Sequence, residues 1–246
     1  MKLRIVILAA GKGTRMGQPF AKALTPVGGM PILGHLLETI QSSGLDPLPV
    51  VVIGHLGDQI RAAMGDRCAY VEQGDPLGTG HAVRMAAPFL MESDAVMVLY
   101  GDHPFISAES LRRIAKEHEE QGNTITLMTT TVPSFEGWHK AFLKWGRILR
   151  GADGAVTDIR EYKDASENER NITEVNPALY CFESSWLWKH LHKLGNRNAQ
   201  KEYYLTDLVA MAVAEGASLS TLPIPPEEAV GINTPEELAF AEGLVK

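Results

Sequence analysis

The stretch Leu8-Ala9-Ala10-Gly11-Lys12-Gly13-Thr14-Arg15-Met16 decides the fold of this chain. It follows the apolar run Arg4-Ile5-Val6-Ile7-Leu8, which is typical of a buried strand in a parallel sheet. Because glycine lacks a Cβ, backbone N–H groups of such a loop can approach an anion closely, and Lys12 and Arg15 add positive charge. Open α/β sheets bind ligands at the carboxyl ends of their strands. The stretch therefore predicts a loop that cradles phosphates.

Two common phosphate-binding loops do not match this stretch. A Walker A loop needs four residues between its first glycine and the Gly-Lys pair, and that spacing is absent. The dinucleotide fingerprint needs a third glycine where Met16 stands, and an acid after the second strand, where the chain reads Gly54-His55. A nicotinamide-dependent oxidoreductase is therefore disfavoured. The alternative to a phosphate loop is a tight turn that needs glycine and binds nothing.

The hydrophobic pattern alternates between strands and helices, which indicates an α/β fold with a doubly wound sheet. We predict strands at 4–8, 50–53, 68–71, 95–99, 124–130 and 219–224, and helices at 31–43, 58–64, 82–90, 108–121, 186–194, 205–215 and 235–242. Between them, 145–150 and 155–160 read as a hairpin, and 174–180 as a further strand. We expect a mixed, Rossmann-like sheet with a small antiparallel annex.

The length of 246 residues fits one domain, with a nucleotide-binding part at about 1–130 and an annex at about 131–230. A net charge of -7 argues against a nucleic-acid-binding protein, because such a protein needs a basic face. Cys68 and Cys181 lack metal-type spacing and read as buried thiols. No run is long enough to span a membrane, and no signal peptide is evident, so we expect a cytoplasmic protein.

A second glycine-rich loop, Glu72-Gln73-Gly74-Asp75-Pro76-Leu77-Gly78-Thr79-Gly80-His81-Ala82, follows the third strand. By strand order it should lie beside the first loop. Gln73 carries an amide donor and acceptor that can read the edge of a base. Thr79 offers a hydroxyl, although it could instead cap the following helix. Lys22 stands close to the first loop and could reach the same phosphates, or it could be a surface lysine.

Asp102 follows the strand at 95–99 and is the first candidate for a metal ligand. Magnesium takes carboxylate oxygens together with substrate phosphates, often with only one or two protein ligands. The alternative is a turn aspartate. His81 and His103 lack zinc-type spacing and read as hydrogen-bonding loop residues. The amide oxygen of Asn233 could complete the magnesium shell.

The polar residues of the annex point to a second substrate. Glu161 and Asn176 could hydrogen-bond sugar hydroxyls or an amide. For Glu161 the alternative is a solvated surface charge. The annex could then act as a lid over the carboxyl ends of the strands.

Taken together, these motifs resemble the nucleotide-sugar pyrophosphorylases. The match is closest to the N-terminal uridylyltransferase domain of the bacterial bifunctional uridylyltransferase/acetyltransferase, and it runs from Leu8 to about Asn233. It is carried by the first loop and by Gln73, Leu77-Gly78-Thr79-Gly80-His81-Ala82, Tyr100-Gly101-Asp102, Gly146-Arg147-Ile148, Glu161-Tyr162-Lys163-Asp164-Ala165, Glu202-Tyr203-Tyr204-Leu205-Thr206-Asp207 and Gly231-Ile232-Asn233. The resemblance implies the nucleotide-diphospho-sugar transferase fold.

The resemblance also implies roles for individual residues. Arg15 and Lys22 would hold the triphosphate and the sugar phosphate as the catalytic cations, and Asp102 and Asn233 would bind Mg²⁺. The residues implied for the nucleotide are Leu8, Ala10, Gly11, Gly13, Gln73, Gly78 and Thr79. Those implied for the amino sugar are Tyr100, Gly146, Glu161, Asn176 and Thr206.

This chain departs from the family pattern at several positions. Ala21 stands where a proline usually precedes the lysine, His103 and Phe105 replace smaller or aliphatic residues, and Trp145 replaces tyrosine. The chain ends near residue 246, so we expect no C-terminal β-helix acetyltransferase domain. A separate acetyltransferase could act alongside it, and the oligomeric state is left open.

The sequence thus predicts Mg²⁺-dependent transfer of UMP from UTP to N-acetylglucosamine-1-phosphate, giving UDP-N-acetylglucosamine and pyrophosphate. One alternative is the same reaction on another pair, with UTP or dTTP and glucose-1-phosphate, or with CTP. A second alternative is a non-catalytic sensor of sugar nucleotides.

Overall fold

The computed structural model describes residues 1–11, 13 and 16–245, and within them ten strands form one mixed sheet. The strand order is β5-β4-β1-β6-β11-β7-β10-β8-β9, with β12 beside β7. The first four strands are parallel: β5 (Ala69–Glu72), β4 (Val50–Ile53), β1 (Leu3–Ala9) and β6 (Ala95–Tyr100). With β1 at the centre, the carboxyl ends of β1 and β6 bring the first loop and Asp102 to the same edge.

The remaining strands make the sheet mixed. β11 (Tyr180–Glu183) runs antiparallel between β6 and β7 (Ile125–Thr131), and β12 (Leu219–Pro223) is parallel to β7. β8 (Arg147–Arg150) and β9 (Val156–Arg160) form the expected hairpin, which joins the sheet through β10 (Glu174–Val175). A separate pair consists of β2 (Pro26–Val27) and β3 (Met30–Pro31). The predicted mixed sheet with an antiparallel annex is confirmed.

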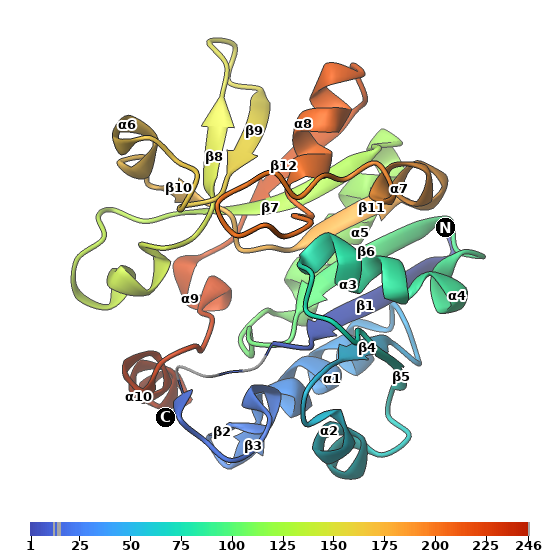
Figure 1. The fold of residues 1–246 in the computed structure, drawn as a ribbon, viewed down its shortest axis with the longest axis vertical. Coiled ribbons are helices and arrows are strands. Elements are labelled where there is room, and N and C mark those ends of the chain that lie inside the picture. Colours follow the sequence, from blue (N-terminus) through green and yellow to red (C-terminus); the bar gives the residue numbers. More distant parts are fainter. Residues whose placement is uncertain (12, 14–15, 246) are drawn as a thin grey trace.

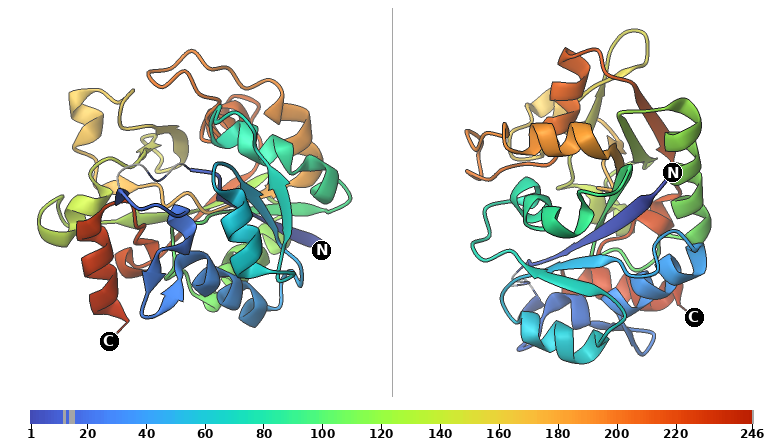
Figure 2. Two further views of the ribbon diagram at one scale, coloured as in Figure 1. Left: turned by 60° about the horizontal axis from the view of Figure 1, so that its bottom comes forward. Right: turned by 90° about the vertical axis from the view of Figure 1, so that its right-hand side faces the viewer.

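Helices cover both faces of the sheet (Figures 1 and 2). Along β1, Ile5 and Ile7 face one apolar core, whereas Val6 faces the other. The first core is covered by α1 (Ile32–Ser43), α2 (Gly57–Met64) and α5 (Ala108–Gln121). The second is covered by α3 (Thr79–Met85), α4 (Ala87–Leu90), α7 (Ser184–Leu191) and α8 (Asp207–Ala214). Successive residues of a strand point to opposite faces of the sheet. Because both faces are buried here, the central strands carry continuous apolar runs.

Shorter elements complete the chain. They are the 3₁₀ turns η2 (Lys22–Leu24) and η3 (Gly137–Phe142) and the helices α6 (Glu167–Arg170), α9 (Pro226–Ala229) and α10 (Pro235–Leu244). Thr234 caps α10 in a capping box with Glu237. In Figure 1, α10 lies beside β2 and β3, and buried Val27, Ile232 and Ala241 pack together there. This packing places Asn233 near the first loop.

Three local predictions were wrong. The expected strand at 174–180 is two strands, because Ala178 has a φ of 57° and Pro177 has no N–H to donate to a ladder. The helix expected at 82–90 begins at Thr79 and is interrupted at Ala86. Gly78, and not Thr79, is the N-cap of α3.

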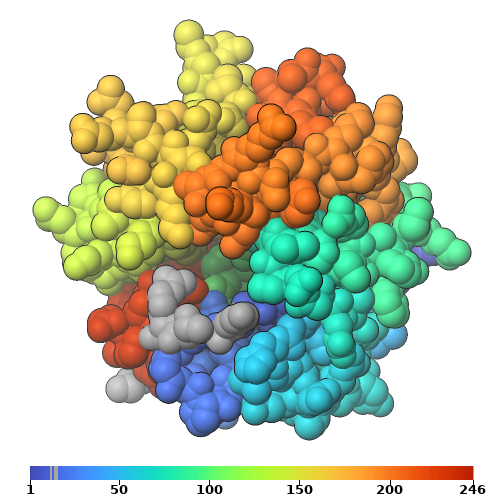
Figure 3. Space-filling model, in the orientation of Figure 1, coloured from blue at the N-terminus to red at the C-terminus, as the bar shows by residue number. Residues whose placement is uncertain are grey.

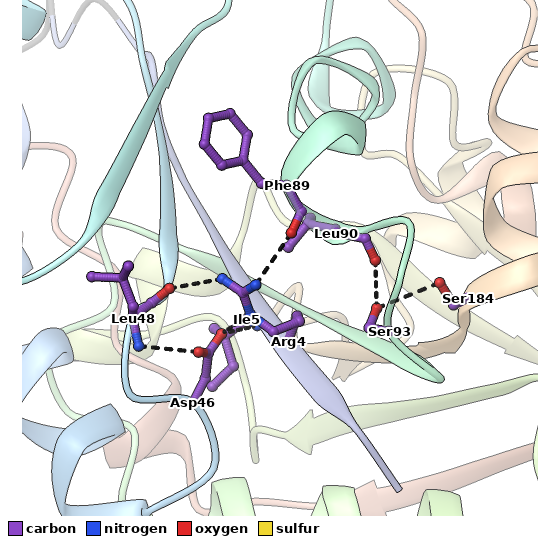
Figure 4. A network of polar contacts seen from close by, with 8 residues as sticks. All are labelled: Arg4, Ile5, Asp46, Leu48, Phe89, Leu90, Ser93 and Ser184. Carbon is purple, nitrogen blue, oxygen red and sulfur yellow. Dashed lines mark hydrogen bonds and ion pairs between the residues drawn. The ribbon is translucent and has the colours of Figure 1, made fainter.

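The amino ends of the strands are fixed by a buried carboxylate (Figure 4). Asp46 accepts hydrogen bonds from Arg4 Nε (3.0 Å) and the Ile5 backbone N–H (2.7 Å). The Arg4 guanidinium also donates to the carbonyl oxygens of Leu48 (2.8 Å) and Phe89 (3.2 Å). These bonds tie β1 to the segment that leads into β4 and to α4. The frame is thus held at the edge of the sheet opposite the glycine loops.

Across the described residues, helices stay too short or too polar to cross a lipid bilayer.

Candidate active site

A pocket opens at the carboxyl ends of β1 and β6, between the two glycine-rich loops. Its lining includes nine of the residues predicted for substrates or metal: Leu8, Ala10, Gly11, Lys22, Gln73, Gly78, Thr79, Tyr100 and Asp102. Figure 3 shows a recess on this face between α3, in teal, and the gold and orange segments beyond residue 150. The expectation that the two loops lie side by side is confirmed.

Lys22 connects the residues predicted to hold a metal. Its ammonium donates to Asp102 Oδ2 (2.7 Å) and to Asn233 Oδ1 (2.9 Å). Only 16% of the Lys22 side chain and 15% of the Asp102 side chain are exposed. These three residues come from η2, the end of β6 and the segment before α10, so the fold gathers them from distant parts of the sequence. A surface lysine at position 22 is excluded by this geometry.

The electrostatics of Asp102 reflect this pairing. Burial acts to raise the pKa of the carboxyl, but the Lys22 ammonium, with a smaller contribution from His103, outweighs it and holds the pKa at about 2. His103 Nε2 lies 3.6 Å from Asp102 Oδ1, and the His103 ring stacks between Tyr100 and Trp145. Asp102 is therefore a carboxylate at any physiological pH, fixed by neighbours on both sides.

The donor set at this point suits a hard cation. A carboxylate oxygen and an amide oxygen converge on one positively charged group, the Lys22 ammonium. Within the described ranges, His, Cys, Asp and Glu side chains do not gather in groups of three or more that could hold a metal. Such a sparse oxygen set fits Mg²⁺, which usually retains water and binds substrate phosphates as well. The residues present thus fit a magnesium ion shared with a substrate.

The second glycine loop is held by the segment before α8. The Tyr203 backbone N–H donates to the Leu77 carbonyl, and the Gly80 N–H donates to the Tyr203 carbonyl, each at 2.8 Å. Gly78 has a φ of 111°, and a Cβ there would lie 2.7 Å from the backbone N and O of Tyr203. Thr79 Oγ1 accepts from the Leu205 N–H at 3.0 Å. Only glycine therefore fits at position 78, and this contact fixes the loop.

Of the residues predicted for the sugar, Tyr100 lines this pocket, whereas Gly146, Glu161, Asn176 and Thr206 form a second cluster. Thr206 donates to Glu161 Oε1 (3.1 Å), and the Asn176 N–H donates to the Gly146 carbonyl (3.0 Å). Burial raises the pKa of Glu161, with nearby carboxylates adding to the shift. A Cβ on Gly146 would lie 3.6 Å from Glu161 Oε1. Glu161 is thus partly buried and hydrogen-bonded to Thr206, and its predicted contact with the sugar stays a prediction.

The first glycine loop contacts Lys22 at Gly13. Gly13 has a φ of 61°, and a Cβ there would lie 2.7 Å from Lys22 Cβ, so the first loop packs directly on this lysine. Arg15 lies outside the described residues, and its predicted role stays a prediction.

Glu202 also lines the pocket, although the sequence did not lead us to assign it to the site. The run from Glu202 to Asp207 carried a family match that could have identified it.

The chain is similar to known proteins over its whole length. The family model described as the MobA-like NTP transferase domain matches residues 5–203. "Bifunctional protein GlmU" of Brevibacillus brevis is 41% identical over 247 residues, and that of a Psychrobacter strain is 43% identical over 242 residues. These matches cover 100% and 98% of this chain, but 52% and 51% of the relatives. The chain therefore spans about half the length of these relatives.

A solved structure has the same fold. A Bacillus anthracis protein described as a glucose-1-phosphate thymidylyltransferase aligns with a TM-score of 0.76 over 98% of this chain and 94% of its own. The two sequences are 18% identical, so this likeness bears on the fold alone. The family match, by contrast, spans both glycine loops and Asp102. The chain belongs to the MobA-like NTP transferase domain family and is a nucleotidyltransferase.

Proposed function

We propose that the protein transfers UMP from UTP to N-acetylglucosamine-1-phosphate in the presence of Mg²⁺. The observation that carries the proposal is the contact of the Lys22 ammonium with both Asp102 and Asn233, beside a pocket bounded by the two glycine loops. The choice of UTP and the N-acetyl sugar is supported by relatives named GlmU and by the match at residues 161–165. Magnesium would be held by Asp102 and Asn233.

In the proposed reaction, a phosphate oxygen of the sugar phosphate attacks the α-phosphorus of the triphosphate in line. A P–O bond forms to that oxygen, and the bond to the β-phosphate breaks, so pyrophosphate leaves with the electron pair. The attacking phosphate is already ionised, so no general base is needed. Catalysis is then positioning and charge neutralisation, as in phosphoryl transfer generally. A bound magnesium ion would neutralise charge that develops on the phosphates.

Lys22 has a defined part in this scheme. In the structure its ammonium contacts both proposed metal ligands, which places it where it would neutralise charge on the substrate phosphates. We propose that Arg15 and the backbone N–H groups of Gly11 and Gly13 contact the triphosphate on the other side. Leu8, Ala10, Gln73, Gly78 and Thr79 would bind the nucleoside. Each of these groups binds or neutralises charge and none moves a proton.

The annex supplies the proposed sugar site. The sugar would meet Gly146, Glu161, Asn176 and Thr206 of the annex, together with Tyr100, which lines the pocket between the glycine loops. A carboxylate oxygen, an amide and a hydroxyl suit sugar hydroxyls and an acetamido group. We propose that residues 1–130 serve the nucleotide and 131–230 the sugar. Acetyl transfer is not proposed for residues 1–246, and a separate acetyltransferase stays a prediction.

Pyrophosphate release tests the proposal. With Mg²⁺, UTP and N-acetylglucosamine-1-phosphate, we expect turnover that is lost on chelation. Asp102→Ala and Lys22→Ala should each lower kcat/KM by about 10²–10³-fold, the usual loss for one preorganised electrostatic contact. Glu119→Ala, at an exposed position on α5, is the matched carboxylate control and should leave turnover unchanged. Absence of turnover with every triphosphate and sugar phosphate would favour the sensor alternative.

A further inference from the structure

Gln73 is held in one orientation by two neighbours. Its Nε2 lies 3.0 Å from the Gly78 carbonyl oxygen and 3.3 Å from His81 Nδ1. A carbonyl oxygen only accepts hydrogen bonds, so the Gln73 atom facing it must be the amide nitrogen. The same carbonyl also accepts the Ala82 N–H (3.1 Å), the first bond of α3. The carbonyl group at the start of the helix is thus one of the two groups that hold the amide in this orientation.

The second amide hydrogen fixes the state of His81. Since Gln73 Nε2 donates toward Nδ1, that ring nitrogen must carry a lone pair, and the imidazole proton is on Nε2. His81 is buried, with 9% of the residue's surface exposed. Burial lowers the pKa of His81 and the Arg84 guanidinium lowers it further, while Asp75 opposes them, so the neutral form is favoured. An acceptor at Nδ1 is consistent with this environment.

One group of Gln73 is left over for a ligand. Among the described residues, Gln73 Oε1 has no hydrogen-bond partner. Every fully buried side-chain oxygen of these residues does have a partner, so Oε1 is not fully buried and is accessible. Gln73 lines the pocket. A carbonyl oxygen accepts the N3–H of uracil or thymine, whereas the unprotonated N3 of cytosine would face it with a lone pair.

We propose that His81 is a positioning residue that sets base selectivity: its Nδ1 takes one amide hydrogen of Gln73, so that Oε1 faces the base and favours uracil or thymine over cytosine. The inference rests on the proposed function, because it requires a nucleotide in this pocket. The inference adds to the proposed function a residue that acts through Gln73. Histidine at position 81 is then needed for its acceptor and not only for packing.

The test compares two variants of the same size and branching. His81→Asn keeps an acceptor near the position of Nδ1, whereas His81→Leu has none. Calorimetric titration with UTP and with CTP gives the ratio of the two dissociation constants without any turnover. The loss of one hydrogen bond should reduce this preference for UTP by about 3- to 10-fold in His81→Leu and leave it nearly intact in His81→Asn. A merely structural role would weaken both nucleotides alike and leave the ratio unchanged.

Two further measurements complete the test. The ¹⁵N spectrum of histidine-labelled wild-type protein should contain an unprotonated Nδ1 signal for His81 at neutral pH; a protonated Nδ1 would overturn the inference even if UTP binds. The matched control is His118→Asn and His118→Leu, because His118 is also buried and its Nδ1 meets Thr126 Oγ1 (3.1 Å). These should not change the ratio. Failure of wild-type protein to bind UTP would overturn the proposed function together with the inference.

Discussion

Replacing Lys22 with methionine is expected to destabilise the protein by about 3 kcal/mol, because it leaves Asp102 largely buried without its cation. The structure gives the scale: the Lys22 ammonium holds the pKa of Asp102 at about 2 despite burial, which corresponds to a free energy on the order of 2 kcal/mol in favour of the carboxylate. Without Lys22, the burial penalty is no longer offset. Removing one partner of a buried ion pair typically costs 3–5 kcal/mol, and partial exposure places this site near the lower end.

Urea unfolding of a double-mutant cycle measures this effect. Lys22→Met, Asp102→Asn and the double variant should give a coupling free energy of about 2 kcal/mol in metal-free buffer. Lys116→Met is the control, because Lys116 is 71% exposed and its pair with Glu120 contributes little. Added Mg²⁺ should restore more stability to Lys22→Met than to the double variant. A coupling below about 0.5 kcal/mol would refute the reasoning.

Three other perturbations have defined outcomes. Gly78→Ala should abolish measurable nucleotide binding in a calorimetric titration while the protein stays folded by circular dichroism, since its Cβ would meet the Tyr203 backbone at 2.7 Å. Glu161→Gln should raise KM for the sugar phosphate about 10-fold in a steady-state assay and leave KM for UTP unchanged, because it removes only the annex charge. Burial and two neighbouring aspartates raise the pKa of Asp207 to about 6, so the folded protein carries a penalty above pH 6 that vanishes below about pH 4. Asp207→Asn should therefore be about 1 kcal/mol more stable at pH 8 and equal to wild type at pH 4 by urea unfolding, the value being reduced for solvent screening.

Much of the fold follows from local patterns in the sequence. The runs Val50–Ile53 and Ala95–Tyr100 are apolar throughout because both faces of a parallel strand are buried. Ser107 caps α5, and Gly44 ends α1 in the left-handed conformation, so these helix ends were predictable from their residue types. The break between β10 and β11 at Asn176–Leu179 was not predictable from residue types, because it depends on the different strands with which β10 and β11 pair in the folded sheet.

Some features of the candidate site were likewise predictable from the sequence, and others were not. The two glycine loops could be recognised because each follows a strand directly, and strand order brought them together. The contact between Lys22 and Asn233 joins residues 211 positions apart, and no local pattern specifies it. The hydrogen-bond direction at Gln73 was equally hidden, since it depends on which carbonyl the folded loop presents. Long-range contacts of this kind require the assembled structure.

A competition experiment tests the substrate assignment most directly. All four ribonucleoside triphosphates and dTTP, at equal concentration, are incubated with the protein, Mg²⁺ and equal amounts of N-acetylglucosamine-1-phosphate and glucose-1-phosphate, and early products are identified by mass spectrometry. Product ratios then equal ratios of kcat/KM. We predict UDP-N-acetylglucosamine as the dominant product. A dominant product with cytosine, or with glucose in place of the N-acetyl sugar, would contradict the assignment of the corresponding half of the site.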